Sequence, residues 1–185
     1  TVKTFFDEIL KLGIDKSIRC GIGILEGHEG METWSAKATD EGEVEMRVGM
    51  LNMTIHPMLK GLKKAWKKGE KGYSYYYTEK DVLKYYQALN NEPEYPFNAN
   101  LDNLPKREYH NSFFFSSGII FAFSENPLTD ESSAVLHRFA EVFGQTYRRY
   151  LDLRKAEAQA KEAQIEAALE KVRSRTMAMQ ASSEL

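Results

Sequence analysis

Hydrophobic positions in the first quarter of the chain follow two different spacings. Apolar residues recur at helical spacing through residues 2–10 and Gly13 follows, which predicts a short amphipathic helix. Alternation then runs through residues 18–24, 31–36 and 44–48, strictly so in the last run, and a glycine-containing turn separates the first two runs. This pattern predicts a β-hairpin followed by a third strand.

The middle of the chain returns to helical spacing twice. Residues 55–66 carry one apolar stripe and predict a helix. Pro57 stands near its start, where proline is well tolerated. Residues 82–89 carry a second stripe, and Thr78 precedes it as a favourable N-cap. The aromatic run YSYYY between the two stripes predicts a short strand.

A stretch without any period follows the second helix. Residues 90–108 are rich in Asn and Pro, and a loop of this length is often a lid or a binding loop. Two strongly apolar runs, HNSFFF and GIIFAFS, then flank a Ser-Ser-Gly turn and predict a second hairpin. The succession of strands and helices is typical of an α+β fold.

From Thr129 the pattern is helical to the end of the chain, with acidic residues on the first turn, where the helix dipole favours them. A continuous helix of roughly 50 residues would be ~75 Å long, too long for a domain of this size to cover. Ile165, Val172 and Met179 lie seven apart, which predicts a coiled coil with a second helix.

Aromatic residues in the first half of this helix do not continue into the phase of Ile165, so we expect a register break near Glu157. The helix is predicted to form a homodimer, and the sequence does not decide between parallel and antiparallel pairing. The residues expected on the dimer side of the helix are Phe143, Tyr150, Ile165, Val172 and Met179.

Composition narrows the class of protein. The 185 residues carry a net charge of −2, so no strong field favours nucleic acid or an anionic membrane. The single cysteine, Cys20, excludes an internal disulfide and fits a reducing compartment, and no apolar run approaches the ~20 residues that span a bilayer. We therefore expect a cytoplasmic protein that neither binds nucleic acid nor inserts into membranes. Because the chain opens on Thr1 and closes inside a helical pattern, we also expect an output domain outside it.

Motifs that would carry enzymatic or cofactor chemistry are absent from the sequence. The four histidines show no metal-ligand spacing, and no nucleophile elbow, Walker loop or kinase signature is present. Gly21 and Gly23 form a G-x-G, but Glu26 stands at the third glycine position, which favours close packing at a strand over a dinucleotide site. Cys20 lies in an alternating strand and is interpreted as a small buried side chain. We expect no enzymatic activity and no metal, and we leave any cofactor open.

Aromatic residues suggest a ligand site. Tyrosine and tryptophan combine apolar rings with polar groups and often line pockets, although a plain aromatic core is the alternative. We expect a small-molecule pocket between the sheet and the 90–108 loop. Its candidate lining residues are Trp34, Tyr75, Tyr77, Tyr109, Phe113 and Phe115.

The order of predicted elements over residues 1–153 resembles a GAF domain. The best local match is the segment SSGIIFAFSENPLTDESSAVLHRFAEVFGQTYRR, which is similar to the closing hairpin and final helix of that family. The tail, AEAQAKEAQIEAALEKVRSRTMAMQASSEL, resembles the signalling helices that join sensory modules in multidomain bacterial sensors. The signature of the cyclic-nucleotide-binding members is absent, as is a bilin-attachment motif.

This resemblance implies a six-stranded antiparallel sheet flanked by helices, a small-molecule pocket and dimerisation through terminal helices. It implies a sensory domain over residues 1–153 and a coiled-coil signalling helix over residues 154–185. Such a module would pass its ligand state to a downstream output domain such as the histidine kinase of a two-component system. The alternative is a GAF-shaped dimerisation spacer that binds no ligand.

Overall fold

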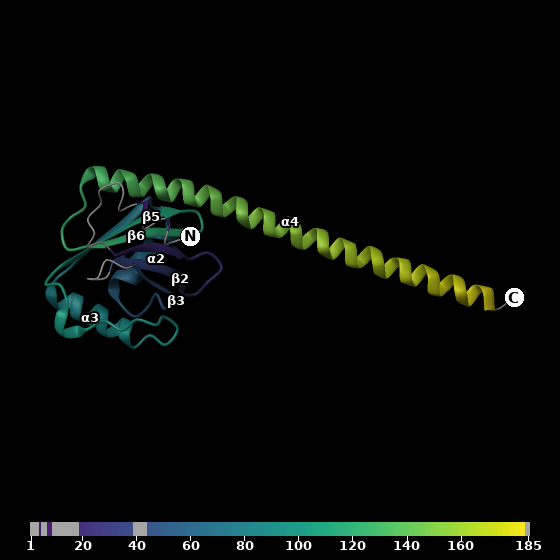
Figure 1. Cartoon of the computed structure of the whole chain (residues 1–185), viewed down its shortest axis with the longest axis horizontal. Coiled ribbons are helices and arrows are strands. Elements are labelled where there is room, and N and C mark those ends of the chain that lie inside the picture. Colours follow the sequence, from purple (N-terminus) through teal and green to yellow (C-terminus); the bar gives the residue numbers. More distant parts are fainter. Residues whose placement is uncertain (1–3, 5–6, 9–18, 39–43, 184–185) are drawn as a thin grey trace. The chain divides into compact units, whose positions relative to one another are not determined.

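The computed structural model describes residues 4, 7–8, 19–38 and 44–183, and it is an α+β structure built on one antiparallel sheet (Figure 1). In the described residues the elements are β1 (Arg19–Ile24), β2 (Met31–Ala38), β3 (Val44–Leu51), α2 (Pro57–Lys67), β4 (Gly72–Tyr77), α3 (Glu79–Asn90), the 3-10 helix η1 (Leu101–Asn103), β5 (Glu108–Phe115), β6 (Gly118–Ser124) and α4 (Asp130–Ser183). The six strands lie in the order β3-β2-β1-β6-β5-β4.

The fold class predicted from the sequence is confirmed: an α+β structure with a six-stranded antiparallel sheet and a long C-terminal helix. Both hairpins, the third strand, the aromatic strand and the two central helices lie where the spacing of apolar residues places them. The helix predicted over residues 2–10 falls largely outside the described residues.

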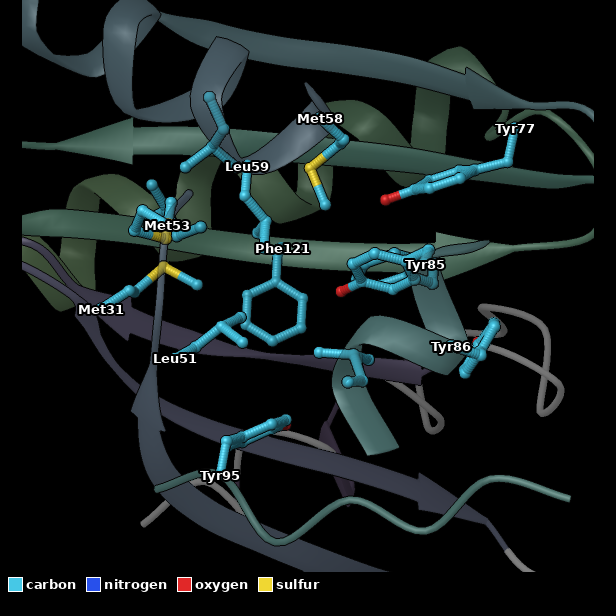
Figure 2. Packing of buried hydrophobic residues seen from close by; sticks show 14 of the residues in the cluster. Met31, Leu51, Met53, Met58, Leu59, Tyr77, Tyr85, Tyr86, Tyr95 and Phe121 are labelled. Carbon is cyan, nitrogen blue, oxygen red and sulfur yellow. The ribbon is translucent and has the colours of Figure 1, made fainter. Parts of the chain in front are cut away.

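The sheet has two faces, because successive side chains of a strand point to opposite sides. The α2–α3 face carries Ile119, Phe121 and Phe123 of β6, which pack in one buried cluster with side chains of α2 and α3. Figure 2 shows the interior of this cluster, where methionine and leucine side chains lie beside the rings of Phe121, Tyr85 and Tyr77. The opposite face carries Phe113 and Phe115 of β5, whose rings contact the first turns of α4, and we call it the α4 face.

Local capping explains where α2, α3 and α4 begin. The Nδ1 atom of His56 accepts a hydrogen bond from the backbone of Met58 at 3.2 Å, immediately before Pro57 at the start of α2. The hydroxyl of Thr78 caps α3 as predicted, and that of Thr129 accepts from the backbone of Ser132 at 3.1 Å. Each cap satisfies a backbone N–H that has no partner within its helix.

Central strand β1 is buried at every position, and its two glycines allow neighbouring chains to approach closely. A Cβ atom on Gly21 would lie 2.1 Å from the carbonyl oxygen of Trp34, and one on Gly23 would lie 2.3 Å from the sulfur of Met31. The interpretation of this G-x-G as close packing at a strand is therefore confirmed. Cys20 is also fully buried, and burial raises the pKa of its thiol to about 12.

Helix α4 contains 54 residues, which corresponds to roughly 80 Å at the usual helical rise. The chain divides into two compact units, residues 1–144 and residues 145–185. The division falls earlier than the boundary expected after Leu153. It falls at Gly144, where a Cβ atom would lie 2.7 Å from the Phe115 side chain, so the glycine marks a close contact between α4 and the sheet.

Replacing Gly21 with Ala is expected to lower the free energy of unfolding by about 3 kcal/mol or more, because the new methyl group meets backbone that cannot move without breaking the β1–β2 pairing. Urea denaturation measures the change. Gly27→Ala is the matched control: this glycine has φ +80° and open space around it, so only the backbone conformation costs energy, about 1 kcal/mol. Equal losses in the two variants would contradict the close-packing account.

Candidate functional site

The six aromatic residues predicted to line one pocket are divided between the two faces of the sheet. Tyr75 and Tyr77 lie on the α2–α3 face, where Tyr77 is fully buried and its ring stacks on His56 at 5.6 Å between centroids. The other four lie on the α4 face, as the strand registers require: Trp34, Tyr109, Phe113 and Phe115. The sheet separates the two groups, so the six residues do not line a common cavity.

On the α4 face, the aromatic residues of β5 serve as packing surface for the start of α4. The ring of Phe115 lies 5.3 Å from that of Phe143, and the ring of Phe113 lies 6.4 Å from that of His137. Phe143, one of the expected dimer residues, therefore packs within its own chain. The other four expected dimer residues belong to the second unit and are exposed in the single chain: Tyr150 at 50%, Ile165 at 45%, Val172 at 61% and Met179 at 72%.

A cavity of about 450 Å³ lies between the sheet, α3 and the 90–108 loop, where the sequence predicts a binding site. None of the six candidate aromatic residues lines it. Its walls combine rings, amides and charged groups: Arg19, Ser35, Ala36, Lys37, Glu45, Arg47, Tyr86, Phe97, Asn98, Ala99, Asn100, Asn103, Leu104, Pro105, Glu108, Phe123, Ser124 and Glu125. We call it the Arg19 cavity.

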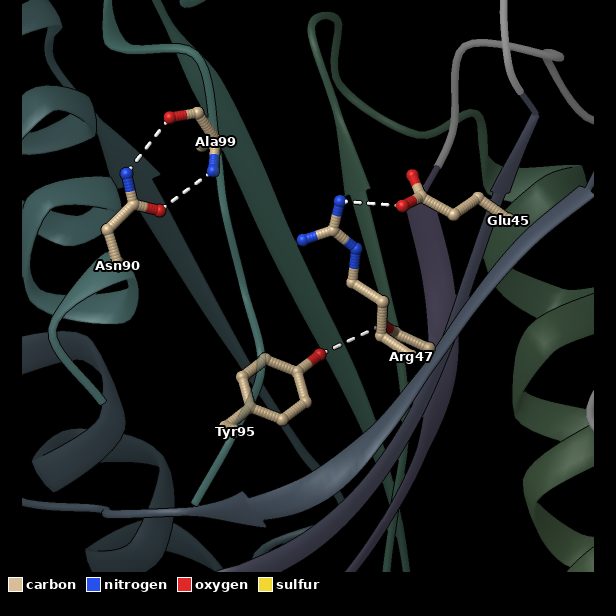
Figure 3. A network of polar contacts seen from close by, with 6 residues as sticks. Glu45, Arg47, Asn90, Tyr95 and Ala99 are labelled. Atoms are coloured by element: carbon tan, nitrogen blue, oxygen red, sulfur yellow. Dashed lines mark hydrogen bonds and ion pairs between the residues drawn. The ribbon is translucent and has the colours of Figure 1, made fainter. Parts of the chain in front are cut away.

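The loop that forms one wall of this cavity is held at two points (Figure 3). The Asn90 side chain accepts a hydrogen bond from the backbone N–H of Ala99 at 2.8 Å and donates one to its carbonyl at 2.9 Å. Tyr95 is buried, and its hydroxyl lies 2.9 Å from that of Ser35 on β2. The loop is therefore an ordered wall that is tied to α3 and to the sheet.

Arg19 is the central charged residue of the cavity and is only 7% exposed. Its guanidinium carbon lies 3.9 Å from the centre of the Phe123 ring and 5.2 Å from that of Phe97. Burial alone would lower the pKa of Arg19, but interaction with the neighbouring Tyr86, Tyr85 and Glu108 raises it above the ordinary value, so the group stays charged. Its Nε and Nη2 atoms are shielded from solvent and have no hydrogen-bond partner.

Glu108 is the buried acid of the same cavity and is also 7% exposed. Its two carboxyl oxygens accept hydrogen bonds from the Tyr86 hydroxyl at 3.0 and 3.2 Å. Burial raises the pKa of Glu108, although the positive charge of Arg19 and the Tyr86 hydrogen bond oppose the rise. The carboxyl group is thus engaged by Tyr86, and it does not bond to the Nε or Nη2 atom of Arg19.

A second arginine, Arg47 on β3, stands at the wall of the cavity. Its guanidinium carbon lies 4.2 Å from the centre of the Phe97 ring, and its Nη2 atom donates to Glu45 at 2.8 Å (Figure 3). Phe97 therefore lies near two guanidinium groups, those of Arg19 and Arg47, and cation–π attraction favours this position. The contact joins the loop to β1 and β3.

His110 lies on the α2–α3 face of β5 and is nearly fully buried. Its Nε2 atom lies 2.6 Å from the hydroxyl of Ser112, whereas Nδ1 has no partner. Burial and, to a lesser degree, the positive charge of Arg19 lower the pKa of His110 to about 3. The imidazole is therefore neutral at physiological pH.

Arg19 and Glu108 were not among the residues singled out from the sequence. A usable signal was present for Arg19, because it stands in the same alternating row as Gly21 and Gly23, whose missing side chains indicate a crowded face. The sequence contains no comparable signal for Glu108. It borders a polar loop, and a charged residue in that position is expected to be the solvent-exposed end of a strand.

Comparison with known proteins gives no relative: the chain matches no protein-family model, no curated protein and no solved structure. Within the described residues, no group of three or more His, Cys, Asp or Glu side chains is placed to hold a metal ion. Over the same part of the chain, no helix is both long and apolar enough to cross a lipid bilayer.

Replacing His110 with Gln is expected to flatten the pH dependence of stability. The unfolded chain binds a proton at His110 below about pH 6.5, whereas the folded protein does so only near pH 3, so the free energy of unfolding falls as pH falls through this window. Between pH 7 and pH 5, His110 is expected to lower the free energy of unfolding by about 2 kcal/mol.

Urea denaturation at both pH values measures this difference in the parent and in H110Q. The control is His137→Gln on the partly exposed surface of α4, which should keep the parent's difference. The account fails when H110Q loses as much stability between pH 7 and pH 5 as the parent does.

Proposed function

We propose that the chain is a sensory module that binds a small molecule in the Arg19 cavity and reports its occupancy through dimeric packing of α4. The observation that carries the proposal is a buried guanidinium group with two unpartnered nitrogens at a cavity of about 450 Å³. This volume lies within the range of small-molecule sites, roughly 300–1,000 Å³. An unpaired buried charge is costly to the folded protein, so a site that retains one favours a ligand that completes it.

The exposed side of α4 supports the dimeric part of the proposal. Ile165, Leu169 and Val172 are between 45% and 61% exposed in the single chain, and they recur at the three- and four-residue steps of a heptad. Apolar side chains in such a row are stabilised when a second helix buries them. A second copy of the same chain supplies a matching row.

A structural route connects the Arg19 cavity with the first turns of α4. Strand β5 carries Glu108 at the cavity and Phe115 at its other end, where Phe115 packs against Phe143 and Gly144. A shift of β5 on ligand binding would therefore act on the packing of α4. The ligand changes the balance of two packings only to the extent that it binds them with different affinity.

The resemblance to GAF domains agrees with this function. In the proposal the chain is not itself an enzyme, it acts in the cytoplasm without binding nucleic acid, and α4 leads to an output domain such as a histidine kinase. A dimerisation spacer without a ligand is the second candidate. It is supported by the dense packing under the sheet, where the void among Met31, Leu59, Phe121 and neighbouring side chains is only about 10 Å³.

Native mass spectrometry of the purified chain is expected to show a retained small molecule. Asn90→Ala should release it, because this change removes both hydrogen bonds that hold the loop at Ala99. The adjacent Asn91→Ala is the control, since the Asn91 side chain bonds only to the carbonyl of Gln87 at the end of α3. If the parent chain carries no molecule and a metabolite library adds none, the spacer function replaces the sensory one.

The double change Ile165→Asn and Val172→Asn is expected to weaken dimerisation at least ~100-fold, because two apolar side chains are lost from each helix at roughly 1.5–3 kcal/mol each. Sedimentation equilibrium across micromolar concentrations measures it. Ala160→Asn with Ala167→Asn introduces the same amides on the opposite side of α4 and should leave the dimer intact. A parent chain that is monomeric throughout this range rules out the dimer.

A further inference from the structure

The arrangement around Arg19 indicates the chemical class of the ligand. A guanidinium group that is only 7% exposed is costly to bury unless an anion and hydrogen-bond acceptors compensate it. The Nε and Nη2 atoms of Arg19 donate no hydrogen bond. These two atoms form one edge of the planar guanidinium group, and that edge offers two parallel N–H donors to a carboxylate.

Neighbouring acids do not fill this edge. The Glu108 carboxyl accepts from the Tyr86 hydroxyl with both oxygens, and the Glu45 carboxyl accepts from Arg47. Neither is bonded to the free edge of Arg19, since its Nε and Nη2 have no partner. A molecule that enters the Arg19 cavity can supply the missing acceptor pair.

The charges that line the cavity favour one negative charge over several. Three basic residues, Arg19, Lys37 and Arg47, stand with three acidic ones, Glu45, Glu108 and Glu125. A phosphate or a nucleotide would bring two or more negative charges close to these carboxylates, and the repulsion is strongest at Glu108, the buried one of the three. A single carboxylate matches one unpaired guanidinium edge without this penalty.

The rings beside Arg19 indicate what the carboxylate is attached to. Phe123, Phe97 and Tyr86 all lie within 5.5 Å of the guanidinium carbon, measured to the ring centres. An apolar or aromatic body would bury its surface against these rings in the available volume of about 450 Å³.

We propose, on the basis of the function proposed above, that the ligand is an organic acid with a single carboxylate on an apolar or aromatic body, and that this carboxylate binds the Nε–Nη2 edge of Arg19. Because that edge is shielded from solvent, binding would move side chains around it, and Phe97 of the loop is one of them. The loop and the strands that carry the cavity then respond to the same event.

Benzoate is the probe that tests this assignment, with benzamide as its uncharged counterpart and adenosine monophosphate as the phosphate-bearing one. We expect benzoate to raise the thermal unfolding midpoint of the full chain in a saturable way, and benzamide and adenosine monophosphate not to. Arg19→Met should abolish the benzoate effect, with affinity at least ~100-fold lower.

Arg19→Lys is the second variant, which is needed in case R19M does not fold. It keeps the positive charge but lacks the pair of parallel N–H donors. It should bind benzoate at least ~10-fold more weakly than the parent. Arg107→Met is the control, since Arg107 is an exposed residue that donates to Asn126 outside the cavity, and it should bind benzoate like the parent.

Three results overturn the assignment: benzoate does not stabilise the parent chain, benzoate stabilises R19K and the parent equally, or adenosine monophosphate stabilises the parent through Arg19. The native mass spectrum separates these failures from failure of the proposed function. A retained molecule that lacks a carboxyl group refutes the ligand class and leaves the sensory function standing. A chain that binds nothing at all refutes both.

Discussion

Burial of the central strand β1 on both faces is the constraint on which the rest of the structure depends. On the α2–α3 face its row of residues is Arg19, Gly21 and Gly23, and the glycines leave the space that Phe121 and Met31 occupy. Arg19 continues the same row at the edge of this crowded region. Its side chain must therefore lie over the sheet rather than in open solvent, and α3 and the 90–108 loop enclose it. The position of the cavity thus follows from the alternation of side chains between the two faces of β1.

Two basic side chains of this interior, Arg19 and His110, contact the same aromatic ring, that of Phe123. Arg19 lies over Phe123, and His110 contacts the same ring edge-on at 4.5 Å between centroids. Burial keeps the imidazole neutral, so no second positive charge opposes the guanidinium. Glu108 provides negative potential without bonding to the Nε–Nη2 edge. The charge of Arg19 is therefore partly compensated, but its Nε and Nη2 atoms have no hydrogen-bond acceptor. An arrangement of this kind is more typical of a binding site than of a core optimised for stability.

Local pattern in the sequence predicted the elements well and the site poorly, for a physical reason. Alternation correctly placed Tyr75 with Tyr77 on one face, and Phe113 with Phe115 on one face. Whether the two pairs share a face depends on the register between β4 and β5, and a shift of one residue exchanges the faces. Arg19 was missed because a charged residue at a strand end is usually solvated. Dimerisation, the ligand and membership of the GAF family stay predictions.

In the proposed function, a signal from the Arg19 cavity to α4 would require that the sheet transmit a displacement across its thickness. Strand β6 is suited to this, because Phe123 lies against Arg19 on one face while the neighbouring Ala122 and Ile120 are buried on the other. Closely packed interiors resist gradual deformation and move between discrete arrangements. If a ligand moved the rings around Arg19, as proposed, the packing of Phe115 on Phe143 and Gly144 would either hold the sheet in place or move with it. The missing Cβ at Gly144 brings the helix so close to Phe115 that little slack remains between them, which favours movement of α4 with the sheet.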